Sequence, residues 1–101
     1  VLVSMSGKRS KGNLCGYSMS KFALMSLCQT MRNEGWGKGI RVTAICPGWV
    51  NTDMAKEITH FPKKDMIQAN DIASICSNLL ALPNSSIPFE ISLNCQLETN
   101  I

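Results

Sequence analysis

The chain has 101 residues, a length that fits one domain. Hydrophobic residues make up 45% of it, which is too many for a disordered chain. The formal net charge is only +3, and the basic residues are scattered except for a Lys-Arg-Ser-Lys run at 8–11. We interpret that run as a solvated loop and expect no nucleic-acid partner.

The first half of the chain predicts a strand and then a long helix. An apolar Val-Leu-Val start predicts a short buried strand over residues 1–4, followed by a loop rich in Gly, Ser and Lys. Because neither a methionine nor a turn precedes the strand, we expect the chain to be a piece of a longer one. The pattern over residues 14–34 predicts a helix, and the glycines that follow are typical of a helix end.

Apolar residues lie almost all round this predicted helix. They are Leu14, Met19, Phe22, Ala23, Leu24, Met25, Leu27, Cys28 and Met31. A helix without a wide polar stripe is buried on more than one side. We therefore expect one side to cover a sheet and the other to meet a second copy of the chain, which predicts a homo-oligomer formed through helix 14–34.

The second half predicts two more strands with a helix between them. A strand rich in β-branched residues is expected over 40–46, and a polar loop with a short helical segment near 54–58 follows. The next helix has Asn70 or Asp71 as its expected N-cap and stops before Pro83. Alternating residues over 89–94 predict the last strand. Strands that alternate with helices in this way indicate a parallel βαβαβ unit of the α/β class.

The cysteines and the lone histidine give no sign of a disulfide framework or a metal site. The odd set of Cys15, Cys28, Cys46, Cys76 and Cys95 contains no CxxC pair, and each cysteine lies among apolar residues, where free cysteine packs as a small hydrophobe. His60 has no second ligand at metal spacing, so we expect no metal. With no signal peptide and no stretch long enough to cross a bilayer, we expect no membrane partner and a cytoplasmic location.

Tyr17 and Lys21 form a Tyr-x-x-x-Lys pair near the start of the long helix. A spacing of four puts both side chains on one helical face. A tyrosine phenol is a weak acid, with a reference pKa of about 10, and a nearby ammonium stabilises the phenolate. Such a pair is suited to proton transfer. The pair alone is weak evidence, since a tyrosine and a lysine on a solvated helix surface would show the same spacing.

Other polar groups are expected at the same edge of the sheet. Ser4 ends the first strand, thirteen residues before Tyr17. The carboxyl edge of an open parallel sheet is where ligands bind, so the Ser4 hydroxyl could bond a carbonyl oxygen there. Asn51 and Thr52 follow the second strand and offer amide and hydroxyl groups to a phosphate or a carboxamide. Ser6 is a rival to Ser4, but it lies two residues nearer to Tyr17.

These residues together resemble the second half of the short-chain dehydrogenase/reductase family. The resemblance rests on Ser4, on Gly7, on Tyr-Ser-Met-Ser-Lys at 17–21 and on Ile-Arg-Val-Thr-Ala-Ile-Cys-Pro-Gly-Trp-Val-Asn-Thr at 40–52. It covers nearly the whole chain. It implies a Rossmann-like doubly wound parallel sheet of which this chain, residues 1–101, supplies the last three strands as the C-terminal catalytic half.

The resemblance also implies a role for each matching residue. Ser4 matches the serine that polarises the substrate carbonyl, Tyr17 the general acid or base, and Lys21 the lysine that stabilises the phenolate and binds the nicotinamide ribose. The resemblance also implies cofactor binding by Tyr17 and Lys21, together with a loop matched by Pro47, Gly48, Val50 and Thr52. The segment 51–54 would open the mobile cover over the substrate.

The same resemblance marks what the sequence lacks. The glycine-rich turn that seats the pyrophosphate is missing, as is the residue that selects between NAD and NADP, so the choice of cofactor stays open. The family asparagine that holds a proton-relay water is missing as well. We expect an NAD(P)-dependent oxidoreductase of carbonyl or alcohol substrates that is inactive as this isolated piece and that needs a separate N-terminal half.

Two alternatives stay open beside an active reductase. One is a truncated relic that folds and oligomerises without catalysis, or serves as an interaction module of the same fold. The other is an unrelated binding module with an accidental motif, which would require several coincidences. Trp49 and Phe61 suit an apolar pocket wall and core packing equally well, so they do not identify the substrate.

Overall fold

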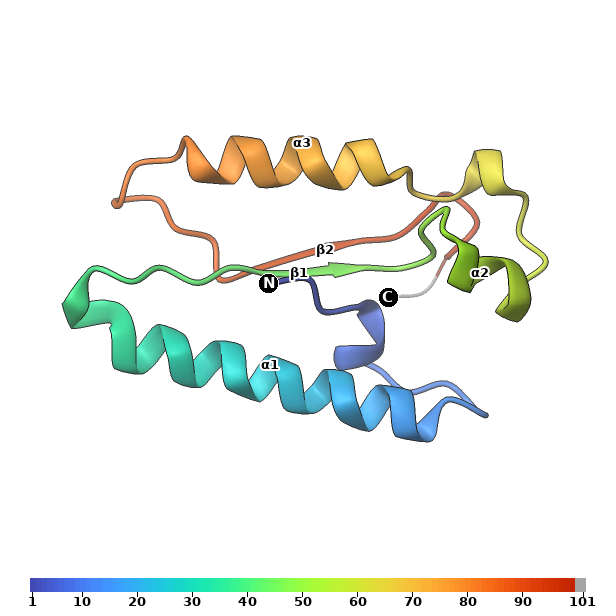
Figure 1. Ribbon diagram of the computed structural model, residues 1–101, viewed down its shortest axis with the longest axis horizontal. Coiled ribbons are helices and arrows are strands. Elements are labelled where there is room, and N and C mark those ends of the chain that lie inside the picture. Colours follow the sequence, from blue (N-terminus) through green and yellow to red (C-terminus); the bar gives the residue numbers. More distant parts are fainter. Residues whose placement is uncertain (100–101) are drawn as a thin grey trace.

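A computed structural model describes residues 1–99, apart from the side chains of residues 56 and 58, and arranges them as helix, sheet and helix (Figure 1). The elements are, in chain order, the 3₁₀ turn η1 (Met5–Gly7), helix α1 (Cys15–Gly35), the 3₁₀ turn η2 (Trp36–Lys38), strand β1 (Ala44–Pro47), helix α2 (Asp53–Ile58), the 3₁₀ turn η3 (Lys63–Asp65), helix α3 (Ala69–Leu80) and strand β2 (Glu90–Leu93). Helices α1 and α3 cover opposite faces of the strands, as the α/β prediction requires.

Strand β1 lies at the centre of the sheet. It runs parallel to β2, in a register that pairs Ala44 with Glu90 and Pro47 with Leu93. On its other side Leu2 pairs with Ile45 in a parallel bridge, and the Val3 amide donates to the Ile45 carbonyl at 2.7 Å. The predicted parallel order of strand, helix, strand, helix and strand is confirmed, although the first strand is reduced to this bridge.

The second strand is shorter than the sequence predicts. The β-branched run begins at Ile40, but regular pairing begins only at Ala44. Pro88 stands just before β2 and has no amide hydrogen to donate, so the ladder cannot extend in that direction. The Thr43 hydroxyl donates to the Pro88 carbonyl instead, which satisfies that acceptor without a strand.

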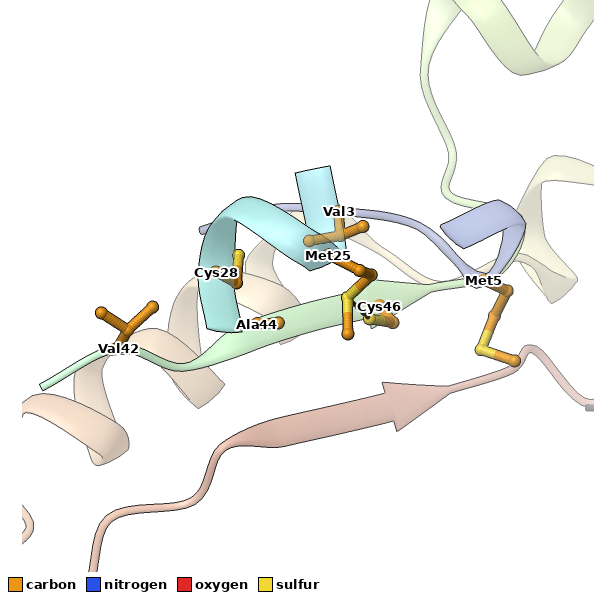
Figure 2. Close-up of a cluster of buried hydrophobic side chains, with 7 residues drawn as sticks. All are labelled: Val3, Met5, Met25, Cys28, Val42, Ala44 and Cys46. Carbon is orange, nitrogen blue, oxygen red and sulfur yellow. Dashed lines mark hydrogen bonds between the residues drawn. The ribbon is translucent and has the colours of Figure 1, made fainter. Parts of the chain in front are cut away.

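Alternate residues of β1 pack into two separate hydrophobic clusters, one on each face of the sheet. Ala44 and Cys46, each 0% exposed, face α1 and join a cluster that includes Val3, Met25 and Cys28 (Figure 2). Ile45 belongs to a second cluster, on the side of α3. Successive side chains of a strand point to opposite faces, so a run of three buried residues identifies β1 as a strand covered on both sides.

Helix α1 buries only part of its apolar surface within the chain. Met25 and Cys28 lie in the core, whereas Met19, Phe22 and Leu27 remain 67%, 44% and 50% exposed. The expected second copy on this side therefore stays a prediction. No helix within residues 1–99 combines the length and apolar character needed to cross a bilayer.

The start of α3 corrects one expectation. The N-cap is Gln68, not Asn70 or Asp71. Asp71 takes the third helical position, where its carboxylate accepts from the Gln68 amide at 3.2 Å and completes a capping box. Asparagine and aspartate are commoner N-caps than glutamine. The preference for these residues therefore placed the predicted start of the helix two or three positions after Gln68.

Candidate active site

An open cavity of about 590 Å³ lies at the carboxyl ends of the first strand and of β1. All of the site residues predicted from the sequence contribute to its lining. They are Ser4, Tyr17, Lys21, Pro47, Gly48, Val50 and Thr52. Ligands bind at this edge in open parallel sheets, and the volume falls within the roughly 300–1,000 Å³ of small-molecule sites.

Ser4 leaves the first strand in an extended conformation, with φ 164° and ψ 156°. Its Oγ accepts a hydrogen bond from the Ser6 amide at 3.0 Å. This bond occupies a lone pair of the oxygen and leaves the hydroxyl hydrogen available to donate into the cavity. Ser6 also reaches the cavity lining, but here its backbone serves to orient Ser4.

Tyr17 and Lys21 extend from the first turns of α1 toward the same cavity. The Lys21 ammonium lies 5.6 Å from the centre of the Tyr17 ring, so the expected proximity is present. Gly7 allows this end of α1 to approach the first strand closely. A Cβ at position 7 would lie 2.9 Å from the Lys21 carbonyl oxygen and 2.8 Å from a Val3 methyl group. The approach that brings Ser4 beside α1 therefore depends on a glycine there.

The loop after β1 forms another wall of the cavity. The Gly48 amide donates to the Leu93 carbonyl at 2.8 Å, and Val50 pairs with Ile67 in an isolated bridge. Thr52 follows as the exposed N-cap of α2, and its side chain makes no capping hydrogen bond. These contacts hold the loop in place while the Thr52 hydroxyl stays at the cavity.

Two further residues of this loop, Asn51 and Trp49, have structural partners. The Asn51 side-chain amide donates from its Nδ2 to Gln68 Oε1 at 3.1 Å, which joins the loop to the start of α3. The Trp49 and Phe61 rings meet edge to face, 6.2 Å apart at 81°, beside the second core cluster. Trp49 also lines the cavity, so this side chain belongs both to the pocket wall and to the second hydrophobic cluster.

Sequence reasoning missed an ion pair in the cavity wall. Arg9, assigned to a solvated loop, is only 19% exposed and pairs with Glu98 at 3.2 Å. The Glu98 side chain is 4% exposed and lies in a C-terminal segment for which no role was predicted. No local sequence motif identifies Arg9 or Glu98 as a site residue. The burial of the Glu98 side chain is visible only in the structure.

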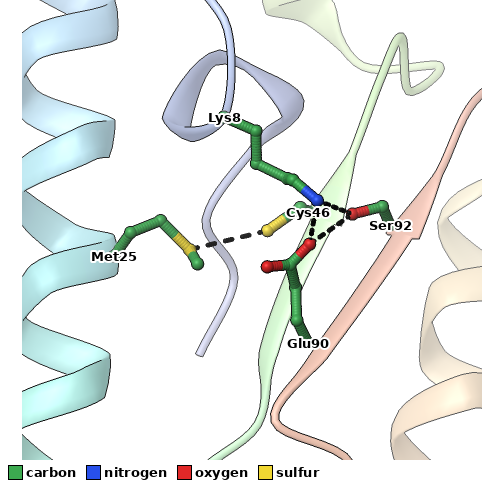
Figure 3. Close-up of polar contacts among 5 residues, drawn as sticks. All are labelled: Lys8, Met25, Cys46, Glu90 and Ser92. Carbon is green, nitrogen blue, oxygen red and sulfur yellow. Dashed lines mark hydrogen bonds and ion pairs between the residues drawn. The ribbon is translucent and has the colours of Figure 1, made fainter. Parts of the chain in front are cut away.

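Cys46 lies close to the polar groups of Lys8, Glu90 and Ser92, but it is a packing residue (Figure 3). Burial raises the pKa of its thiol, with a hydrogen bond to the Ser4 backbone acting in the opposite direction. Its Sγ lies 3.7 Å from the Met25 sulfur inside the first core cluster. A buried thiol of this kind is unreactive. Within residues 1–99 no three His, Cys, Asp or Glu side chains form a group that could hold a metal ion.

The chain matches the family model described as short chain dehydrogenase over residues 1–63. That span is more than half of the chain and includes every predicted site residue. The chain therefore belongs to the short-chain dehydrogenase/reductase family of oxidoreductases, and the resemblance inferred from its motifs is confirmed.

Curated relatives are much longer than this chain. An agropine synthesis reductase of Rhizobium rhizogenes is 38% identical over 95% of the chain, which spans 22% of that protein. Protein MoaE of Klebsiella aerogenes is 34% identical over 81% of the chain and is 32% covered by it. The chain thus corresponds to a minor part of each of these relatives.

Solved structures agree with the fold. A betaketoacyl-[ACP] reductase from Bacteroides thetaiotaomicron is 36% identical, with a TM-score of 0.75 over 95% of this chain and 39% of that one. An alcohol dehydrogenase from the archaeon Thermococcus sibiricus, complexed with 5-hydroxy-NADP, is 24% identical. It reaches a TM-score of 0.83 over 100% of this chain and 43% of that one. The second likeness concerns the fold alone.

Proposed function

We propose that the chain is the catalytic part of an NAD(P)-dependent oxidoreductase that interconverts a carbonyl and an alcohol. The observation that carries this proposal is the single cavity into which Ser4, Tyr17 and Lys21 converge from two segments. The loop of Pro47 and Gly48 faces them from the end of β1. A hydroxyl, a phenol and an ammonium at one ligand edge fit proton transfer to a carbonyl oxygen.

The residues present fit the nicotinamide end of a dinucleotide. Lys21 offers an ammonium to ribose hydroxyls, and Thr52 offers a free hydroxyl at the opposite wall. Pro47, Gly48 and Val50 provide a mostly apolar surface for a flat ring. When bound, the cofactor supplies or accepts the hydride. Solved neighbours are described as complexes with 5-hydroxy-NADP and with NADH, so NAD and NADP are both candidates.

The chain's own residues would move and stabilise the proton. The Ser4 hydroxyl, oriented by the Ser6 amide, donates to the substrate oxygen and fixes its position. Tyr17 gives its phenolic proton to that oxygen during reduction and takes it back during oxidation. The Lys21 ammonium stabilises the phenolate left on Tyr17. Ser4 and Tyr17 act on the same oxygen atom and Lys21 acts through Tyr17, which is why the three must share one cavity.

We also propose that catalysis needs more of the family domain than this chain supplies. The chain spans 39–43% of the first two solved neighbours. The adenosine and pyrophosphate of a dinucleotide would make their contacts with a separate N-terminal half. Binding energy from such remote groups is what positions the reacting ring.

A second candidate function is self-association without catalysis. Met19, Phe22 and Leu27 are large apolar side chains of α1 that stay exposed in the chain. Exposed apolar surface on one helix favours a protein contact. A homo-oligomer formed through α1 is compatible with the reductase, and it does not require that the chain bind a cofactor.

Titration of the full chain with NADH and NADPH, with light scattering beside it, tests the two candidates. Saturable binding of either dinucleotide supports the reductase. Absence of binding by the chain alone fits both the second candidate and a catalytic part that needs its N-terminal half. A concentration-dependent dimer in light scattering supports self-association. A clean monomer at high concentration would contradict self-association through α1.

If the chain binds a dinucleotide, substitutions test the proposed proton donor. Tyr17→Phe removes the proton and should lower the rate of hydride transfer by about 10²–10⁴-fold while leaving cofactor binding nearly intact. Ser4→Ala should slow the same step, whereas Ser6→Ala should retain most of the rate because only its backbone contacts Ser4. Equal losses in the two serine variants would contradict the assignment to Ser4.

A further inference from the structure

The Glu98 carboxylate connects segments that lie far apart in the sequence. Its Oε2 accepts from the Trp49 amide at 2.9 Å and from the Cys95 amide at 3.1 Å. Its Oε1 accepts from the Arg9 guanidinium at 3.2 Å. A carboxylate that is almost fully buried needs such donors to remain charged, and charge-assisted bonds of this kind are the strong ones. Glu98 is thus anchored on three sides.

The Glu98 carboxylate occupies the space that a side chain at position 48 would need. A Cβ at Gly48 would lie 2.0 Å from Glu98 Oε2 and 2.6 Å from its carboxyl carbon. The φ of Gly48 is outside the left-handed range, so its backbone conformation does not itself require glycine. Space does require it, because any side chain at position 48 would displace Glu98. The need for Gly48 is therefore explained by a contact within this chain.

The pair of Arg9 and Glu98 lies in the wall of the candidate active site. Both residues line the cavity that also contains Ser4 and Tyr17. Arg9 belongs to the segment between those two residues, and Trp49 belongs to the loop after β1. One carboxylate therefore bonds to both of the segments that face each other across the cavity.

We infer that Glu98 is a positioning residue, whose carboxylate holds the loop of Pro47 to Val50 against the segment that carries Ser4 and Tyr17. This role rests on the proposed function, which assigns the loop to the cofactor and the other segment to the carbonyl. The C-terminal segment is then part of the site. Glu98 lies beyond residues 1–63, the span matched by the family model, so the family motifs do not identify it.

The chain contains a matched control for this inference. Lys8, next to Arg9, pairs with Glu90 of β2 and lies 3.3 Å from the Ser92 hydroxyl (Figure 3). This ion pair also joins the segment after the first strand to the C-terminal part of the chain. It differs in being exposed and in lying outside the cavity lining. Glu90→Gln therefore removes a comparable contact without touching the site.

The chain also contains well-placed spectroscopic probes. Tyr17 is the single tyrosine, and the two tryptophans are Trp36 and Trp49. Isotope labelling of tyrosine and tryptophan thus gives one ring signal inside the site, one backbone amide bonded to Glu98, and one remote amide as an internal reference. The full chain should be examined as wild type, Glu98→Gln and Glu90→Gln, by nuclear magnetic resonance.

We expect Glu98→Gln to speed hydrogen exchange of the Trp49 amide at least tenfold and to shift the Tyr17 ring signal, while Trp36 is unchanged. Glu90→Gln should alter neither probe. Glu98→Asp, which keeps the charge, should restore the Tyr17 signal at least in part. If Glu98 only attached the C-terminal segment to the loop, Glu98→Gln would speed exchange of the Trp49 amide but leave the Tyr17 ring signal as it is in Glu90→Gln. That result would overturn the inference.

Cofactor titration separates this inference from the proposed function. If the wild type binds NADH or NADPH, Glu98→Gln should weaken binding at least tenfold and Glu90→Gln should not. If the wild type binds neither, the chain alone does not hold a dinucleotide, and the Trp49 and Tyr17 signals still decide the role of Glu98. Unchanged cofactor affinity in Glu98→Gln, beside a wild type that binds, would contradict the inference directly. Glu98→Asp provides a folded comparison if Glu98→Gln proves unstable.

Discussion

Two ion pairs one residue apart join the same loop to the C-terminal part of the chain, in different surroundings. Lys8 and Glu90 are 30% and 27% exposed, and their pair lies over the strands β1 and β2 on the side of α1. Arg9 and Glu98 are 19% and 4% exposed, and their pair lies in the wall of the cavity. The exposed pair has one further partner, the Ser92 hydroxyl, whereas the buried carboxylate also takes two backbone amides.

The comparison teaches that burial, more than the count of ion pairs, decides what a charge does for the structure. An exposed pair is screened by water and contributes little. A buried carboxylate dictates the geometry around it, because every donor that it loses leaves a polar group without a partner. The substitutions below test that difference, from the largest expected effect to the smallest.

Glu98→Leu should cause the largest loss of stability. It leaves the Arg9 cation without its partner and the amides of Trp49 and Cys95 without an acceptor. Breaking a buried pair costs roughly 3–5 kcal/mol, and the partial exposure of Arg9 favours the lower end, about 3 kcal/mol. Urea denaturation measures the change in the free energy of unfolding. A loss no larger than that of Glu90→Leu would contradict the comparison.

Gly48→Ala should cost less, about 1–3 kcal/mol, because the new methyl group would displace the Glu98 carboxylate. The cost should shrink in a Glu98→Ala background, since the displaced atoms are then gone. A double-mutant cycle of unfolding free energies measures this coupling. Additive effects of the two substitutions would show that Gly48 is needed for some reason other than Glu98.

Glu90→Gln should have the smallest effect, below about 1 kcal/mol near neutral pH. The hydrogen bond from Lys8 lowers the pKa of Glu90 in the folded protein below its ordinary value of 4.5. The pair therefore stabilises fully above that value and is lost as pH falls through the folded pKa. Unfolding curves of wild type and Glu90→Gln should converge in acid. A difference that persists at low pH would contradict this assignment.

Local patterns were enough to predict the order of the elements and the placing of the candidate site residues around one cavity. Tyr17 and Lys21 are four residues apart on one helix, so their proximity follows from helix geometry alone. Ser4 and Gly48 end parallel strands, and such ends meet at one edge of the sheet. These residues could be predicted because each one's position depends on its own element.

Other features depend on tertiary partners that no local pattern indicates. Glu98 meets Arg9 and Trp49 only after the chain has folded back on itself, so Arg9 was interpreted as a loop residue. The start of β1 depends on Pro88 in the partner segment, not on the β-branched run itself. Gln68 became the cap of α3 because the structure also supplied Asp71 as its partner.

The parallel pairing of the strands determines the order in which this chain can fold. Leu2 reaches its partner Ile45 only across the whole of α1, and Ala44 reaches Glu90 only across α3. Helices form from local contacts, whereas each of these pairings must first close a long loop, at a cost in chain entropy. The sheet and the site at its edge therefore assemble late. Without Glu98 the chain would still carry Ser4, Tyr17 and Lys21, but it would lack the carboxylate that joins Arg9 to the loop after β1.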